Sequence, residues 1–255
     1  MPVLGEAVPF AGGLAWPLAA TVSGLIAGSV ANAAIERLPR DEPFESPLFR
    51  CVSCRVREPF VDAIPIVGWL ARGGRCRFCR SHMATQHPVV EAVNGVLWLL
   101  IAGAFPPSIR ALAIMLFVTA LLVLSLIDLE HHLLPDLITL PGVVIGIGAT
   151  WIPGWPVTFI DSALSAAVGY FAMMALAKAA EMYYREEALG QGDWKMVAML
   201  GAFLGSSKLV VVVLAANILG ALIGLLLVAV LGDEGRQKLP LGTFLGAAGI
   251  VMTLI

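Results

Sequence analysis

Long stretches of apolar residues recur along the whole chain, and they limit its possible folds more than any other feature. A helix needs about 20 apolar residues to cross the hydrocarbon core of a bilayer, and about 17 is the usual minimum. The sixth and eighth of the stretches found here are shorter, so six or seven crossings are alternatives to eight. The predicted spans lie at about 14–35, 89–105, 109–127, 137–152, 159–180, 196–205, 209–231 and 241–255.

The composition agrees with an all-α polytopic membrane protein whose main partner is the lipid bilayer. Hydrophobic residues make up 59% of the chain and charged residues only 13%, and the mean hydropathy is +0.89. Soluble globular domains are less apolar and carry more charge. No Lys or Arg precedes the first span, so we expect it to stay in the membrane rather than to be removed as a signal peptide. The oligomeric state cannot be inferred from the sequence.

The basic residues predict an orientation in the membrane. Nine of the sixteen Lys and Arg residues lie between residues 37 and 80. If that segment is cytoplasmic, alternation across eight spans leaves only Arg110 and Lys208 on the external side, in agreement with the positive-inside rule. This topology explains the basic loop without a nucleic acid partner. The other basic residues on the cytoplasmic side would be Lys178, Arg185, Lys195, Arg236 and Lys238.

The chain divides into a first transmembrane helix (1–37), a cytoplasmic domain (38–88) and a membrane core (89–255). The cytoplasmic domain contains all four cysteines, as two Cys-x-x-Cys pairs separated by twenty-one residues. Two such pairs can surround one tetrahedral zinc ion with four thiolates, whereas a reducing cytoplasm disfavours the alternative of two disulfides. We expect a structural zinc ion without an open coordination position. Its ligands would be Cys51, Cys54, Cys76 and Cys79.

A second polar segment, LIDLEHHLLPDLITLP, joins two predicted spans. Asp136 follows Pro135 at the start of a span, where a carboxylate commonly caps free N–H groups at the positive end of the helix, and we favour this structural role. Asp128 ends the preceding span, where its charge meets the negative end of the helix dipole, so it needs another partner. Ionisable residues at membrane depth are functional candidates. His131 and His132 fit a solvated turn better than a metal site.

A third polar segment contains GQGDWK, from Gly190 to Lys195. Gly190 and Gly192 permit positive φ angles and a close approach of neighbouring chain, so we expect the segment to bend Asp193 toward the helix bundle. The partner at the same predicted membrane face is Asp128. Lys195 could bias this pair, but a side chain that extends to the interface is the simpler interpretation. Taken alone, the motif also fits a glycine-rich turn that ends in a helix-capping Asp.

Two neighbouring carboxylates suggest a chemical function. They do not both ionise easily, so they share one proton; one can then act as base on a water molecule while the other polarises a scissile carbonyl. Asp128 and Asp193 therefore predict aspartic proteolysis. Two other classes remain open. A proton-coupled transporter would use embedded aspartates as a relay, although the two halves lack an obvious inverted repeat. In a non-enzymatic assembly scaffold the aspartates would only cap helices.

These features, in this order, resemble the type IV prepilin peptidase family, the leader peptidases and N-methyltransferases of type IV pilus and type II secretion systems. AGSVANAAIERLP (27–39) is similar to the family's signature at the end of the first span. IPIVGWLARGGRC (64–76) lies between the cysteine pairs, as in the family's zinc domain. IDLEHHLLPDLITLP (127–141) and GQGDWK are similar to the segments that hold its two catalytic aspartates. A presenilin-like protease shares Gly-x-Gly-Asp but is not expected to carry the cysteine loop.

The resemblance implies that Asp128 and Asp193 are the catalytic pair. It also implies cleavage of a short basic leader after a glycine in a prepilin or pseudopilin, and methylation of the new N-terminus from S-adenosylmethionine. The protein would lie in the bacterial inner membrane, with the zinc loop and the aspartates at the cytoplasmic side. Thr243 departs from the family pattern, in which a second Pro is common at this position. The supporting positions of the motifs are Gly190, Gly192, Lys195 and Asp136.

Overall fold

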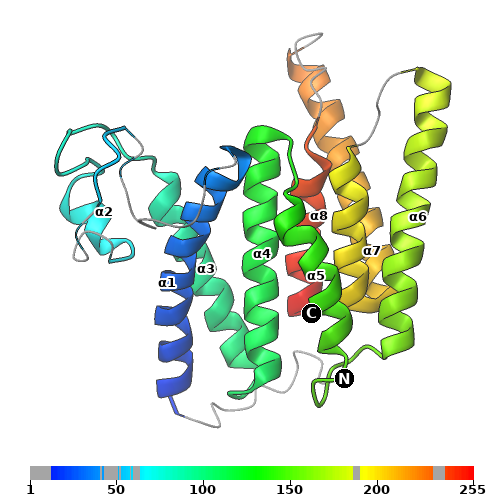
Figure 1. Cartoon of the computed structure of the whole chain (residues 1–255), viewed down its shortest axis with the longest axis horizontal. Helices are drawn as coiled ribbons and strands as arrows, with labels where there is room; N and C mark the ends of the chain where they lie inside the picture. The colour runs from blue at the N-terminus through cyan, green and yellow to red at the C-terminus, as the bar shows by residue number, and fades with distance from the viewer. Residues whose placement is uncertain are drawn as a thin grey trace. The chain divides into compact units, whose positions relative to one another are not determined.

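Helices are the main secondary structure in the part of the chain that the computed structural model describes, which is residues 13–40, 42, 51, 53–57, 59, 64–185, 190–231 and 239–255. Among these residues, extended segments pair only as an isolated bridge, as between Arg75 and His82. Parts of the predicted domain 38–88, and Arg236 and Lys238, lie outside the described residues. The elements in Figure 1 are α1 Ala15–Arg37, η1 Leu38–Arg40, α2 Val67–Ala71, α3 Gln86–Ala104, α4 Ile109–His131, α5 Asp136–Ala149, α6 Phe159–Tyr184, α7 Gln191–Leu231 and α8 Leu241–Leu254.

The helices have the lengths and compositions expected of membrane spans. Within the described residues, five segments are long and apolar enough to cross a bilayer, namely α1 with η1, α3, α4, α6 and α7. The helices α5 and α8 are apolar but have 14 residues each, which corresponds to about 21 Å of helix. The prediction of an all-α polytopic membrane protein is confirmed.

The sixth and seventh predicted spans are two helical parts of α7, separated by a reversal of direction at the non-helical residue Gly205. A straight helix of its 41 residues would be about 60 Å long, twice the thickness of the hydrocarbon core. Gly205 has φ 73° and ψ 176°, a conformation that side chains disfavour. The Asp161 carboxylate accepts a hydrogen bond from the Ser206 N–H at 3.3 Å, and so caps the second part. The two parts of α7 run in opposite directions in Figure 1.

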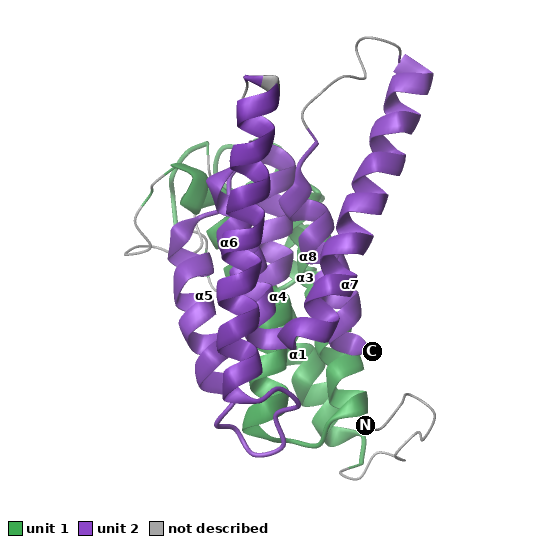
Figure 2. Cartoon of the chain, turned by 90° about the vertical axis from the view of Figure 1, so that its right-hand side faces the viewer, with its two compact units in different colours: residues 1–119 green, residues 120–255 purple. Residues whose placement is uncertain are grey.

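The chain forms two compact units, residues 1–119 and 120–255, whose border lies within α4 (Figure 2). In the first unit α1 packs closely against α3. A Cβ atom at Gly24 would lie 2.8 Å from the Trp98 side chain, and one at Gly28 would lie 2.7 Å from the Glu91 Cα. Small residues let transmembrane helices approach in this way. The three-part division of the sequence stays a prediction.

Polar groups link the helices of the first unit. Asn94 is fully buried; its amide donates to the Gly24 carbonyl at 2.8 Å and accepts from the Thr119 hydroxyl at 2.8 Å. The Trp98 indole donates to the Thr119 hydroxyl at 3.0 Å. Inside a bilayer such bonds each contribute about 0.6–2 kcal/mol to helix association.

In the second unit the first part of α7, residues 191–204, is surrounded by α5, α6 and α8. Glycines at the contacts show how close these helices come: a Cβ at Gly146 of α5 would lie 2.7 Å from the Phe203 ring, and one at Gly249 of α8 would lie 2.6 Å from the Leu200 side chain. Met196 and Met199 are almost completely buried. This part of α7 is therefore held rigidly, and Asp193 lies in its first turn.

Candidate active site and metal centre

Asp128 lies in the last turn of α4 and is buried, with 5% of its surface exposed. Its Oδ2 atom accepts hydrogen bonds from the Thr243 backbone N–H at 2.8 Å and from the Thr243 hydroxyl at 3.3 Å. Thr243 is the third residue of α8, where N–H groups have no partner within the helix. The positive end of α8 therefore meets the carboxylate and compensates its position at the negative end of α4. The sequence predicted the need for a partner but did not identify Thr243.

Gly242 makes this contact possible. A Cβ atom at Gly242 would lie 2.9 Å from the Asp128 Oδ2 and 2.9 Å from the Leu134 Cδ1. A side chain at this position would push the start of α8 away from Asp128. The signal in the sequence was LPLGTFLG, whose glycine precedes the donor residue.

Asp193 is the third residue of α7 and is also buried, with 9% of its surface exposed. Its N–H donates to the Gly190 carbonyl at 3.2 Å, and the Gly190 N–H interacts with its carboxylate. This reciprocal arrangement resembles a capping box, in which the third residue of a helix reaches back to the N-cap residue. The helix-capping alternative for GQGDWK is thus part of the structure.

The two glycines of GQGDWK act differently from the prediction. Neither is among the described residues with positive φ, so they do not bend the chain through a left-handed conformation. The expected close approach is present, because a Cβ at Gly192 would lie 2.7 Å from the Leu134 Cβ. Gly190 ends the connection before α7 and accepts the first hydrogen bond of the helix.

The structure brings the two aspartates together. Asp128 and Asp193 are close enough for their negative charges to repel each other. Leu134 packs beside both, through Gly242 next to Asp128 and through Gly192 next to Asp193. His132 is exposed on the turn after α4, near enough to Asp128 to interact with its charge. Two buried carboxylates from α4 and α7 thus lie within electrostatic reach of each other in the second unit.

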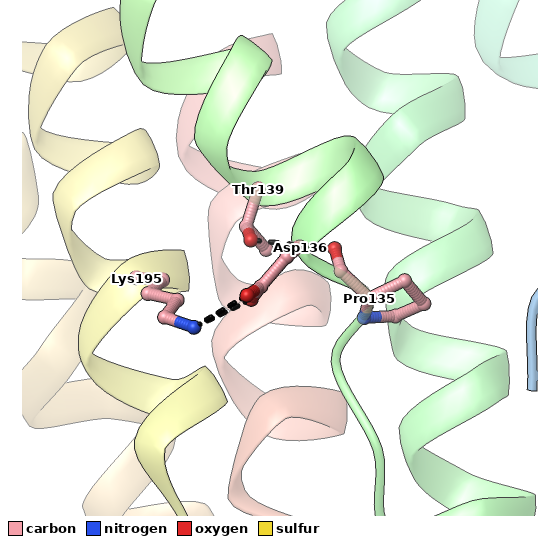
Figure 3. Close-up of polar contacts among 4 residues, drawn as sticks. All are labelled: Pro135, Asp136, Thr139 and Lys195. Carbon is pink, nitrogen blue, oxygen red and sulfur yellow. Dashed lines mark hydrogen bonds and ion pairs between the residues drawn. The ribbon is translucent and has the colours of Figure 1, made fainter.

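Asp136 and Lys195 form an ion pair beside this site (Figure 3). The Lys195 Nζ lies 2.6 Å from one carboxylate oxygen of Asp136 and 2.7 Å from the other. Asp136 is the first residue of α5, whose N-cap is Pro135, and no side-chain bond caps this helix end. The negative charge of Asp136 at the positive end of α5 is still favourable, but its carboxylate oxygens accept their hydrogen bonds from the Lys195 ammonium. The pair links the start of α5 to the first turns of α7.

The four cysteines converge on one position in the first unit. Their sulfur atoms all lie within 4.8 Å of one another, and no disulfide joins them. The Cys51 and Cys79 sulfurs are 3.7 Å apart, and those of Cys54 and Cys76 are 3.9 Å apart. Four ligands at about 2.3 Å around a tetrahedral zinc ion would be about 3.8 Å from one another. The donor set and its spacing therefore fit a tetrahedral metal ion.

The two Cys-x-x-Cys turns have the same backbone pattern. In the first, the Cys51 N–H donates to the Val56 carbonyl and the Cys51 carbonyl accepts from the Arg55 N–H. Cys76 makes the equivalent bonds in the second turn, at the same spacing. Arg55 and Arg80, which follow the second cysteine of each pair, both have positive φ, at 57° and 60°. Each turn thus directs both of its sulfurs to one side.

The thiols differ in acidity. Burial opposes ionisation of Cys51, but the Cys54 N–H and other donors outweigh it and lower the pKa of this thiol to about 6. The Val56 N–H favours the Cys54 thiolate, yet burial and the neighbouring sulfurs raise the pKa of that thiol to about 11. Four thiolates at this distance repel one another, so a bound cation is needed to hold all of them ionised.

Comparisons with known proteins cover nearly the whole chain. Residues 115–225 match the type IV leader peptidase family, and residues 22–105 match the bacterial peptidase A24 N-terminal domain. The prepilin leader peptidase/N-methyltransferase of Pseudomonas putida is 32% identical over 92% of this chain and 89% of the relative. The type 4 prepilin-like proteins leader peptide-processing enzyme of Escherichia coli O78:H11 is 34% identical over 92% and 93%. No solved structure matches the chain.

Proposed function

Because the chain belongs to the type IV leader peptidase family, we propose that it removes the leader peptide of prepilins or pseudopilins and methylates the new N-terminus. The observation that carries the peptidase proposal is the pair of buried carboxylates from α4 and α7, Asp128 and Asp193. Aspartic proteolysis requires two such groups near each other. The burial of both carboxylates and the Thr243 donors to Asp128 support this proposal.

The roles of the two aspartates follow from acid–base chemistry. The pair holds one proton. The ionised carboxylate removes a proton from a water molecule, whose oxygen attacks the carbonyl carbon of the scissile peptide. The protonated carboxyl donates its proton to the carbonyl oxygen. As the tetrahedral intermediate collapses, the leaving nitrogen takes the proton that the first carboxylate removed from water, and a hydroxyl of the intermediate returns a proton to the other carboxylate. The Thr243 N–H holds Asp128 in place during these steps, and the packing of Gly192 on Leu134 holds Asp193.

The membrane sidedness of the site is inferred from charge. Both aspartates flank segments that the basic residues assign to the cytoplasm. A substrate whose basic leader stays cytoplasmic, and whose following apolar helix lies in the bilayer, presents its cleavage site at the same level. We therefore place the reaction at the cytoplasmic face of the bacterial inner membrane.

The cysteine cluster is proposed to hold a structural zinc ion. Four protein sulfurs would complete its coordination, so the ion would stabilise the loop rather than activate water. S-adenosylmethionine would supply a methyl group to the new N-terminal amine: the nitrogen–carbon bond would form as the sulfur–methyl bond breaks, S-adenosylhomocysteine would leave, and the amine would lose one proton. We assign no residues to that cofactor.

A cleavage assay tests the peptidase proposal. A model prepilin is incubated in liposomes with the wild type, Asp128→Asn or Asp193→Asn, with S-adenosylmethionine present, and the products are weighed by mass spectrometry. Glu130→Gln is the matched control, because Glu130 is an exposed carboxylate on the same helix as Asp128. Both Asn variants should lose cleavage, and the wild-type product should gain the mass of one methylene group. Cleavage by a folded Asn variant would reject the dyad and favour the transporter or scaffold alternative.

A further inference from the structure

The segment Ile64–Arg80, which contains α2 and the second cysteine turn, is tied to the transmembrane helices of the first unit by Glu91. Glu91 lies on α3 and is buried, with 8% of its surface exposed. One carboxylate oxygen accepts from the Ile66 N–H at 2.7 Å, and the other accepts from the Ser29 hydroxyl of α1 at 2.6 Å. Ile66, the residue before α2, is therefore held at the same depth along α3 as Glu91.

That level lies inside the membrane-spanning length of α3. Glu91 is five residues beyond the first residue of α3, Gln86, which corresponds to about 7.5 Å along the helix axis. The whole helix has 19 residues, or about 28 Å, and a bilayer core is about 30 Å thick. Ile66 is thus held near the boundary between hydrocarbon and headgroups. Figure 1 shows α2 at the height of the upper turns of α1 rather than beyond the end of that helix.

The outer side of α2 is apolar. Val67 and Leu70, which lie three residues apart on one side of the helix, are 58% and 62% exposed. The opposite side carries Trp69, whose ring lies 2.7 Å from where a Cβ atom of Gly74 would be. Trp69 therefore packs against residues 72–80, the metal loop that contains the second cysteine turn. Val67 and Leu70 point away from this loop, at the depth of the membrane interface.

The same segment is strongly basic. Ile64–Arg80 contains four arginines and no Asp or Glu. Arg75 and Arg80 flank the second cysteine turn and are exposed, and Phe78 between them is 53% exposed. Apolar and aromatic side chains with Arg at an interface are typical of segments that lie on a membrane surface. A basic leader peptide would be repelled by this charge, so it is not the partner that the surface fits.

We propose that Ile64–Arg80 is an interfacial anchor that binds anionic phospholipid headgroups. Val67 and Leu70 enter the boundary of the acyl chains, and Arg75 and Arg80 contact headgroup phosphates, for which their planar donors are suited. The anchor and the bonds of Glu91 together hold the metal loop against the bilayer, independently of whether the enzyme cleaves prepilins.

Hydrogen exchange in nanodiscs tests this anchor. The wild-type protein is placed in nanodiscs of phosphatidylcholine alone, or with about one third phosphatidylglycerol, and amide exchange of residues 64–80 is measured by mass spectrometry. Each Arg near an anionic surface contributes about a fivefold preference. Anionic lipid should therefore slow exchange in the wild type, and Arg75→Gln/Arg80→Gln should remove up to about 25-fold of this protection. Val67→Ser/Leu70→Ser should speed exchange in both nanodiscs.

The controls separate a lost anchor from a lost fold. Lys178→Gln/Arg185→Gln removes the same charge from the end of α6 and should leave exchange in 64–80 unchanged. Each variant is also assayed for bound metal and prepilin cleavage, so that a misfolded loop is recognised. Equal wild-type exchange in the two nanodiscs would overturn the proposal. Protection that appears only when a prepilin is added would also overturn it, because the surface would then bind protein.

Discussion

The position of Asp193 should depend on the absence of a side chain at Gly192. A Cβ atom there would lie 2.7 Å from the Leu134 Cβ, whereas carbon atoms pack at about 3.5–4.0 Å. The Leu134 Cβ is attached directly to its backbone and cannot rotate away. Gly192→Ala must therefore move the start of α7 by about 1 Å, and Asp193 is the next residue. A displacement of about 1 Å in a catalytic group can reduce the rate by about 100-fold.

Stability should change less than activity in this variant. Overpacking costs about 1–3 kcal/mol, and replacing a helical Gly by Ala returns up to about 1 kcal/mol. Gly148→Ala is the matched control, since α5 has open space around a Cβ at that position, and it should cleave normally. Cleavage kinetics and thermal unfolding in detergent measure both effects. If folded Gly192→Ala cleaves prepilin within about threefold of the wild type, Asp193 does not need the position that we assign to it.

Further variants test the other contacts. Thr243→Val keeps the N–H bond to Asp128 but removes the hydroxyl, whose single proton lies between the Ser125 carbonyl at 3.0 Å and Asp128 at 3.3 Å. Cleavage should therefore fall about three- to tenfold, and an unchanged rate would show that the hydroxyl is unimportant. Lys195→Gln breaks the ion pair with half-exposed Asp136; because exposed pairs contribute at most about 1 kcal/mol, the melting temperature should change little while cleavage falls only modestly. Purified protein should contain one metal equivalent per chain, and Cys51→Ser should lose it while the dyad chemistry is retained. Acid should release the metal as the thiolates become protonated, which metal analysis after dialysis can follow.

The features that sequence analysis predicted depend on local pattern. Membrane spans could be recognised because each helix must satisfy its backbone within itself and expose apolar side chains to lipid. The metal cluster could be recognised because each Cys-x-x-Cys turn directs two sulfurs through its own backbone bonds. For Gly190 and Gly192 the expected positive φ angles were wrong, whereas the expected close approach was found at Gly192. The sequence shows that a glycine is present, but it does not show whether the fold uses it for positive φ or for close packing.

The contacts that sequence analysis missed are long-range. Thr243 is 115 residues from Asp128, and only the fold brings the free N–H groups of α8 to the end of α4. The ion pair of Lys195 and Asp136 spans 59 residues. Neither partner can be identified from a hydropathy profile, because the choice depends on which helix ends meet.

The reversal at Gly205 connects these long-range contacts to the candidate site. If α7 continued straight, its second part would leave the membrane and the connection to α8 would begin at the wrong end. Because α7 turns back, its second part runs back toward the end at which α7 begins, and α8 can start beside Asp128. The Lys208 ammonium, just after the reversal, donates to the Met252 carbonyl in the last turn of α8 at 2.8 Å, which fixes the opposite end. The conformation of Gly205, which only glycine adopts easily, thus allows the Thr243 N–H at the N-terminal end of α8 to reach Asp128.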